Sequence, residues 1–191
     1  MKIKTFILSF IAIVGLTACK QTPVTPRSSM PKEYTEAWQE IHGHCYDSIP
    51  YAVVSLDLYS DGLSLDADHR MQGTGYNLYI SDIFVPDSLL EQGTYTSLPK
   101  DSLSTFDFRL STYTFLPGRV FEGTPTGLYL LYVQEGRLMN VQLLDSGSFV
   151  VRDTTNGFTD LQFKLYYTSV YGTQATYETH FQGVLHPWQK Q

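Results

Sequence analysis

The chain has 191 residues and a formal net charge of −6, and it is rich in tyrosine and phenylalanine, with 14 and 11 residues. A domain of this size buries about 70% of the surface of its unfolded chain, so it can fold on a hydrophobic core without disulfide bonds. Its acidic charge repels phosphate backbones and no basic stripe is present, so nucleic acids and other polyanions are not expected as partners.

Residues 1–18 have the features of a signal peptide. Lys2 and Lys4 form a basic start, an apolar run extends from Phe6 to Leu16, and small residues precede Cys19. The run of about eleven residues is shorter than the roughly 20 that a membrane-spanning helix needs. We therefore expect any membrane attachment to come from a lipid.

Cys19, directly after Thr17 and Ala18, resembles the lipobox cysteine of bacterial lipoproteins, whose sulfur is acylated before the leader is cleaved. The resemblance implies a mature chain that starts at Cys19, has a net charge of −8 after the loss of two lysines, and is held stably by two or three acyl chains. Lys20 replaces the aspartate that retains enterobacterial lipoproteins in the inner membrane. This favours the outer membrane, with the domain on either face. The alternative is an ordinary secretory leader followed by a chance cysteine.

Residues 19–30 are predicted to be a flexible tether, and residues 31–191 a single β domain. The tether is rich in Thr, Pro, Ser and Gln and cannot bury enough apolar surface to offset its ordering entropy. Residues 31–41 favour either one short N-terminal helix or a strand that packs its aromatics on the sheet. Trp38 is expected to be buried in both cases.

From Tyr51 onward the pattern is strand after strand, separated by Gly, Asp, Asn or Pro. Ala52 to Tyr59 alternates with a period of two, which predicts a half-buried strand. Two apolar runs flanking residues 134–137 predict a hairpin with Gly136 at a positive φ. The other strands are predicted at residues 76–83, 106–115, 127–133, 138–144, 147–152, 158–167 and 175–185.

This succession of strands predicts an all-β fold. Short loops favour a single antiparallel meander closed into a lipocalin-like (calycin) barrel of about 8 to 10 strands, because Greek-key sandwiches need longer crossovers. A β-sandwich is the alternative.

Three stretches resemble small outer-membrane lipoproteins of Bacteroidetes whose function is uncharacterised: residues 51–62, residues 75–96, and the last two strands. In such proteins one strand is followed by L-P-x-G-T-Y and the chain ends on Y-x-G-x-L. Residues 90–95 and 181–185 stand at those places, with Glu91 in place of the usual proline. The resemblance implies an all-β, calycin-like domain and carries no catalytic residues.

His42, His44 and Cys45 form the densest cluster of metal-capable side chains, and His180 or Asp47 would have to supply a fourth ligand. The alternative, which we prefer, is that Cys45 is a small buried hydrophobe and the histidines line a wet loop. We therefore predict no metal and no cofactor.

An acidic loop near His69 contains Asp61, Asp66 and Asp68, oxygen ligands of the kind that calcium takes. The loop lacks the spacing and the glycine of an EF-hand. A solvated turn is therefore the preferred interpretation.

No nucleophile elbow, His-Glu-x-x-His or phosphate-binding glycine loop is present, so no catalytic residue is assigned. A carboxylate-dependent hydrolase would need two acids that face each other across a cleft. Asp57, Glu122, Asp160 and Glu178 are the acids that this hypothesis leaves open.

The surplus of strand tyrosines favours ligand binding, because tyrosine offers a flat apolar face with a polar rim. The candidate ligand-binding residues are Tyr79, Tyr129, Tyr132 and Tyr166. We expect a non-catalytic, lipid-anchored envelope protein that binds a small molecule, a glycan or a protein partner. The alternatives are an assembly protein that pairs through exposed strand edges, and the hydrolase.

Replacement of the lipobox sulfur tests the anchor. In its native host, the Cys19→Ser variant is expected to lose incorporation of labelled palmitate and to move from the membrane fraction to the soluble fraction, because no second anchor is expected. Mass spectrometry of the wild-type N-terminus should show an acylated cysteine. A wild-type protein that is cleaved without acylation would establish the ordinary secretory leader instead.

Overall fold

The structure, a computed structural model, describes residues 29–44, 50–100, 112–152 and 158–188. These residues form strands joined by turns and loops, with no α-helix among them, so the all-β prediction is confirmed. In these ranges no helix is long and apolar enough to cross a bilayer. Cys19, Cys45, Asp47, the tether up to residue 28 and most of the predicted strand 106–115 lie outside the described residues.

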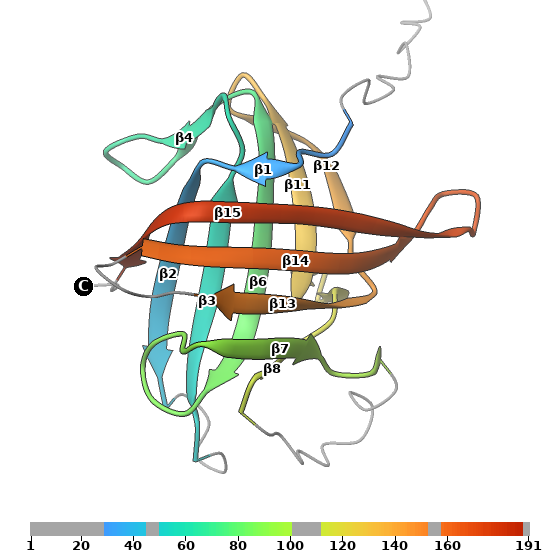
Figure 1. Cartoon of the computed structure of the whole chain (residues 1–191). Helices are drawn as coiled ribbons and strands as arrows, with labels where there is room; N and C mark the ends of the chain where they lie inside the picture. Colours follow the sequence, from blue (N-terminus) through green and yellow to red (C-terminus); the bar gives the residue numbers. More distant parts are fainter. Residues whose placement is uncertain (1–28, 45–49, 101–111, 153–157, 189–191) are drawn as a thin grey trace, which may run out of the picture.

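Eight strands close into the predicted calycin-like barrel, with further strands attached to it (Figure 1). The ring closes at β6, which pairs with β3 along one edge and, near its end, with β8, where Ile83 lies opposite Phe115. In ring order the strands are β2 (Glu36–Gly43), β3 (Ala52–Tyr59), β6 (Gly75–Val85), β8 (Thr114–Phe115), β7 (Gly93–Ser97), β13 (Ser146–Arg152), β14 (Phe158–Thr168) and β15 (Gln174–Trp188).

The barrel is flattened into two layers whose strands run across each other (Figure 1). The front layer contains β7, β13, β14 and β15. In the back layer, β11 (Leu128–Gln134) and β12 (Arg137–Leu143) extend the sheet of β2, β3 and β6 beyond the ring. Gly136 takes a φ of 73° in the turn between β11 and β12, as predicted for that hairpin.

Most neighbouring strands are antiparallel, as predicted, but the barrel is not a pure antiparallel meander. Within the ring, β7 pairs parallel with β8, and β15 pairs parallel with β2. A ring of eight strands can close only with an even number of parallel neighbours, because strand direction must return to its starting value. The parallel β7–β8 pair therefore requires a second parallel pair, and β15 supplies it on its return to β2.

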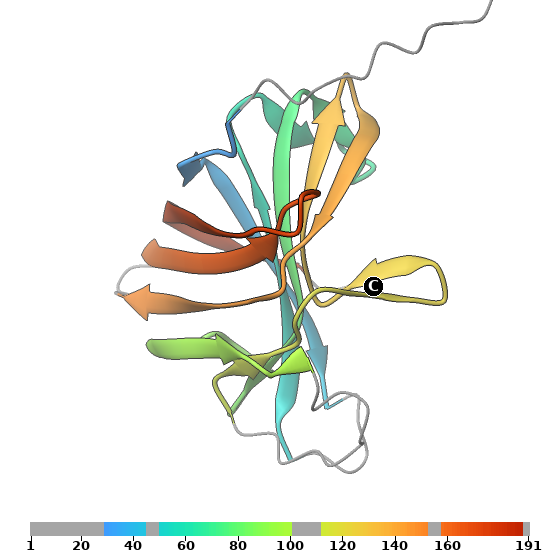
Figure 2. The same ribbon diagram turned by 90° about the vertical axis from the view of Figure 1, so that its right-hand side faces the viewer.

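Two small hairpins stand outside the barrel wall. One is made by β4 (Leu63–Leu65) and β5 (Met71–Gly73), the other by β9 (Arg119–Phe121) and β10 (Thr124–Thr126). The β9–β10 hairpin projects from the outer face of the back layer, where it is the yellow hairpin at the right of Figure 2.

The N-terminal segment is a strand and not a helix. β1 (Glu33–Tyr34) pairs parallel with β15, and β2 occupies the edge of β3 that a helix would have left without a partner. Tyr34 is buried, its hydroxyl lies 2.8 Å from that of Tyr177, and the Tyr177 hydroxyl donates to the carbonyl of Pro31 at 2.8 Å. The prediction that Trp38 is buried is wrong: it lies half-buried on the outer face of β2.

β3 is buried on both faces, so the predicted half-buried strand is wrong. The inward residues Val54, Leu56 and Leu58 belong to the barrel core. On the outward side, Val53 packs with a cluster that includes Phe84, and Tyr59 is only 1% exposed. The β4–β5 hairpin and β11 pack on Tyr59, and Leu116 and Leu98 pack with Val53. A local alternation pattern cannot indicate these contacts.

The inside of the barrel is filled by side chains, as expected for a ring of eight strands. Phe149 lies at its centre: its ring stacks on Tyr95 with centroids 4.7 Å apart and contacts the rings of Phe115 and Phe163. Because aromatic rings fill the core, we expect a ligand to bind on the surface of the barrel and not inside it.

Removal of the central ring tests this packing. Phe149→Ala is expected to lower the free energy of unfolding by about 3 to 5 kcal/mol, because it leaves a cavity between three aromatic neighbours. Phe158 is 61% exposed at the start of β14 and gives a matched control, and Phe158→Ala should change stability by no more than about 0.5 kcal/mol. Urea denaturation measures both. Equal losses would contradict a core centred on Phe149.

Candidate functional site

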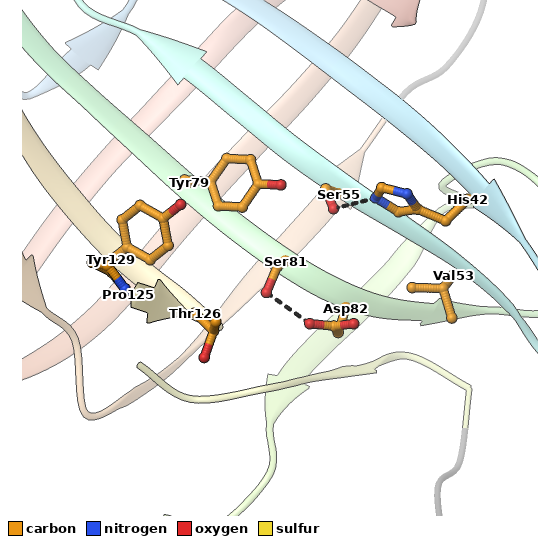
Figure 3. Close-up of a pocket in the computed structure, with 9 residues that line it drawn as sticks. All are labelled: His42, Val53, Ser55, Tyr79, Ser81, Asp82, Pro125, Thr126 and Tyr129. Atoms are coloured by element: carbon orange, nitrogen blue, oxygen red, sulfur yellow. Dashed lines mark hydrogen bonds between the residues drawn. The ribbon is translucent and has the colours of Figure 1, made fainter. Parts of the chain in front are cut away.

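A groove of about 460 Å³ lies on the outer face of the back layer (Figure 3). Strands β2, β3, β6 and β11 form its floor, and the β9–β10 hairpin supplies one wall. The lining residues are His42, Val53, Ser55, Tyr79, Ser81, Asp82, Pro125, Thr126 and Tyr129.

Two tyrosines meet in this groove. Tyr79 and Tyr129 lie directly opposite each other on β6 and β11, and their ring centroids are 5.1 Å apart with an interplanar angle of 30°. Burial raises the pKa of both hydroxyls, so they stay protonated at neutral pH and can donate hydrogen bonds. Both rings are half-buried on rigid strands, which keeps the pair in place for a ligand.

His42 closes the end of the groove near the end of β2. Its Nε2 lies 2.7 Å from the Ser55 hydroxyl and 3.9 Å from a carboxylate oxygen of Glu40. His44 is exposed on the bend after β2, and Gly43, with a φ of 66°, redirects the chain between the two histidines. Within the described ranges, no three His, Cys, Asp or Glu side chains gather as a metal site would require.

A bulge in β6 builds the wall of the groove. The register between β3 and β6 shifts around Ser81 and Asp82, and Asp82 takes a φ of 52°. The Ser81 hydroxyl accepts a hydrogen bond from the backbone N–H of Gly127 at 2.8 Å and donates to the Asp82 carboxylate at 2.8 Å. The bulge thereby ties the base of the hairpin, with Pro125 and Thr126, to the groove floor.

A half-buried acid, Asp57, lies beside the groove. The Asp57 carboxylate accepts hydrogen bonds from the Tyr59 hydroxyl at 2.6 Å and from the side-chain amide of Asn77. Burial raises the pKa of Asp57; the two hydrogen bonds oppose this, and the negative charges of Glu40 and Glu36 add to it. Among the described residues that line the groove there is no lysine or arginine, and Asp82, with Asp57 and Glu40 nearby, gives it a negative potential that favours uncharged or cationic ligands.

The acids left open for hydrolysis do not converge. Asp160 lies opposite Gln182 on the β14–β15 ladder, whereas Glu178 lies opposite Lys164, so the two acids are about 14 Å apart along the strands. A hydrolytic pair requires roughly 5 to 9.5 Å. Glu122 stands at the turn of the projecting hairpin, and Asp57 is on another strand with both carboxylate oxygens already accepting hydrogen bonds.

The four candidate tyrosines divide between different places. Tyr79 and Tyr129 line the groove, whereas Tyr132 points inward, packs on Tyr76 and lines a second hollow of about 260 Å³ beside Pro31. Tyr166 lies on β14, opposite Ser146 and Thr176, on the other layer.

Sequence reasoning missed Ser55, Ser81, Asp82 and the hairpin wall. The Ser81-Asp82 pair interrupts the apolar pattern of β6, and this interruption was the available signal for a bulge.

The acidic loop is a structural turn in the part of the chain that the structure describes. One Asp66 oxygen accepts the backbone N–H groups of Asp68 and Arg70, both at 2.9 Å, and the other accepts the side-chain amide of Gln72. These hydrogen bonds, chiefly that from Arg70, lower the pKa of Asp66. The carboxylate therefore organises the β4–β5 turn.

No protein-family model, curated protein or solved structure matches the chain. The chemistry of the groove must therefore carry the argument for function. The paired tyrosine rings can stack on a ligand. The hydroxyl groups, the imidazole and the nearby carboxylates can accept hydrogen bonds from it.

Neutralising this half-buried acid tests its environment. Because the pKa of Asp57 is raised in the folded state, the folded protein holds this proton more tightly than the unfolded chain, and stability falls as pH rises from the ordinary aspartate pKa through the raised one. Asp57→Asn should therefore gain stability relative to wild type from acidic to neutral pH.

Urea denaturation over this pH range measures the difference. Asp87, exposed in the loop after β6, supplies the control variant Asp87→Asn, which should track wild type. A difference between Asp57→Asn and wild type that does not change with pH would show that Asp57 titrates normally.

Proposed function

We propose that this protein is a lipid-anchored cell-envelope protein that binds an uncharged glycan, without catalysis, in the groove between Tyr79, Tyr129 and the β9–β10 hairpin. The observation that carries the proposal is the pair of adjacent tyrosine rings, fixed on two paired strands beside polar acceptors.

The groove chemistry matches a sugar. A pyranose ring has C–H faces that pack on aromatic rings and a rim of hydroxyl groups that donate hydrogen bonds. Ser55, Ser81, Asp82 and His42 supply acceptors around the tyrosine pair. The negative potential from Asp57 and its neighbours disfavours phosphorylated, sulfated or carboxylated ligands.

The geometry of the acids supports binding over hydrolysis. Asp160 and Glu178 are too far apart to act as a hydrolytic pair, and both oxygens of the Asp57 carboxylate already accept hydrogen bonds, from Tyr59 and Asn77. The Tyr59 hydroxyl stays protonated because burial raises its pKa. This network is suited to holding β3 and β6 rigid under the groove.

The place where the described chain begins supports display from a membrane. The described chain enters the barrel at the end that carries β1, whereas β2 ends at the opposite end (Figure 1). An anchor at Cys19 would then leave the groove end of the barrel turned away from the lipid.

A second candidate function is assembly through β12. This strand ends the sheet, and no other described strand pairs with its outer edge. Leu138 and Met139 on it are 58% and 47% exposed. A strand edge with apolar side chains can accept a partner strand. Sedimentation of the purified protein with and without other envelope proteins tests this role.

Isothermal titration with cello-, malto- and manno-oligosaccharides tests the glycan proposal. Tyr129→Ala is expected to weaken binding about tenfold, because it removes one of the two stacked rings. Tyr166→Ala, which removes a half-buried tyrosine from the other layer, is the matched control and should bind as wild type does. Equal loss in both variants would place the binding site elsewhere, and the absence of binding to every uncharged glycan would refute the proposal.

A further inference from the structure

A row of side chains crosses the outer face of the back layer in one register. His186 on β15 lies opposite Trp38 on β2, Trp38 opposite Asp57 on β3, Asp57 opposite Tyr79 on β6, and Tyr79 opposite Tyr129 on β11. Residues in one register point to one face of a sheet, so this row is continuous across five strands.

The two ends of the row are pairs of rings. Trp38 and His186 have centroids 4.9 Å apart at 34°, which resembles the arrangement of Tyr79 and Tyr129 at the other end. The side-chain N–H of Trp38 donates to Glu36 at 2.6 Å, which fixes the indole on the surface.

A second tryptophan extends the far end of the row. Trp188, two residues beyond His186, stacks on His69 with centroids 4.8 Å apart at 11°. His69 also meets Trp38 edge to face at 6.2 Å and takes a φ of 59° in the turn that Asp66 organises. Trp38 and Trp188 are half-buried and His186 is exposed, so this end can be reached from solvent.

We infer that the groove is one end of a longer site, and that the row from Tyr129 to His186 binds an extended, uncharged polysaccharide chain. The inference rests on the proposed glycan function and adds the length and direction of the ligand. Four strand spacings of ~4.8 Å make the row about 19 Å long, enough for several sugar units laid across the strands.

The polar groups of the row select the ligand class. The carboxylates of Glu36, Glu40 and Asp57 lie beside the rings and can accept hydrogen bonds, and the indole N–H of Trp38 already donates to Glu36. The hydroxyls of Tyr79 and Tyr129 can donate at one end of the row. A glycan brings many hydroxyl donors to such a surface. A proline-rich peptide brings carbonyl acceptors and few donors, so it would place its carbonyl oxygens beside these carboxylates, although the two tyrosine hydroxyls could donate to it.

The sheet also resists peptide addition at this site. β2, β3 and β6 each have a paired strand on both edges, which leaves little free edge for a peptide to add as a strand. Recognition here must come from side chains.

The chain offers a built-in readout, because Trp38 and Trp188 are its only two tryptophans. Selective excitation of tryptophan therefore reports on the end of the row that is distant from the Tyr79–Tyr129 pair. The experiment titrates the purified protein with cello- and malto-oligosaccharides from disaccharide to hexasaccharide, and measures affinity and tryptophan emission together.

The inference predicts that affinity rises about tenfold with length, and that tryptophan emission changes with the hexasaccharide but not with the disaccharide. We expect Trp38→Ala to weaken hexasaccharide binding about tenfold and to leave disaccharide binding unchanged. His186→Ala removes an exposed side chain, so it disturbs the fold less, and it should have the same effect on binding. Tyr171→Ala removes a tyrosine that is 90% exposed in the loop between β14 and β15, and should change neither.

Other outcomes overturn the inference in distinguishable ways. If disaccharide and hexasaccharide bind equally and tryptophan emission stays constant, the extended site is refuted while the groove stands. If no oligosaccharide of any length binds, the proposed function fails and the extended site fails with it. If a polyproline peptide binds and shifts tryptophan emission, the row is a binding surface but its ligand is not a glycan.

Discussion

Closure of the sheet is the constraint on which the rest of this structure depends. The short contact between β6 and β8 and the parallel return of β15 to β2 complete the ring, and the ring encloses a core packed with aromatic rings. Among the described strands, closure removes edges from the ring and leaves β12 at the end of the extended sheet. Since side chains fill the inside of the barrel, we expect ligands to bind on its outer faces.

The outer face of the back layer is unusual because it is covered and polar at once. Asp57, Tyr59 and Asn77 form a hydrogen-bonded network there, between β3 and β6. A buried carboxylate is costly unless its oxygens are satisfied, and here both are. The network therefore gives a rigid, negatively charged base to the aromatic residues around it, at a price in stability at neutral pH.

Segments far apart in the chain complete the groove. The bulge at Ser81 and Asp82 bonds to Gly127, about 45 residues later, and this contact holds the β9–β10 hairpin over the floor. Gly127 takes a φ of 75°, and a Cβ there would lie 2.0 Å from the carbonyl oxygen of Pro117, so only glycine fits at the hairpin base. The groove wall is thus built from one hairpin, whose base requires Gly127, and one bulge.

Local pattern was sufficient for most of the long strands, but it missed β7 of the ring and the strands of the two small hairpins. The alternation over Ala52–Tyr59 gave the bounds of β3, and the Gln134–Arg137 turn predicted both the β11–β12 hairpin and the positive φ of Gly136. These features follow from side-chain period and turn chemistry, which act over a few residues. The all-β class and the barrel followed from the succession of such elements.

Contacts between distant segments decided the features of the fold and the groove that local pattern could not. Residues 31–41 suit a helix or a strand locally, and they are a strand because β3 and β15 offer edges to pair with. Tyr79, Tyr129, Tyr132 and Tyr166 are alike in sequence, yet the register of β6 against β11 puts the first two together and turns Tyr132 inward. The two-residue period of a strand predicts that neighbouring side chains point to opposite faces. Which of the two faces is covered, and by which segments, depends on the assembled sheet.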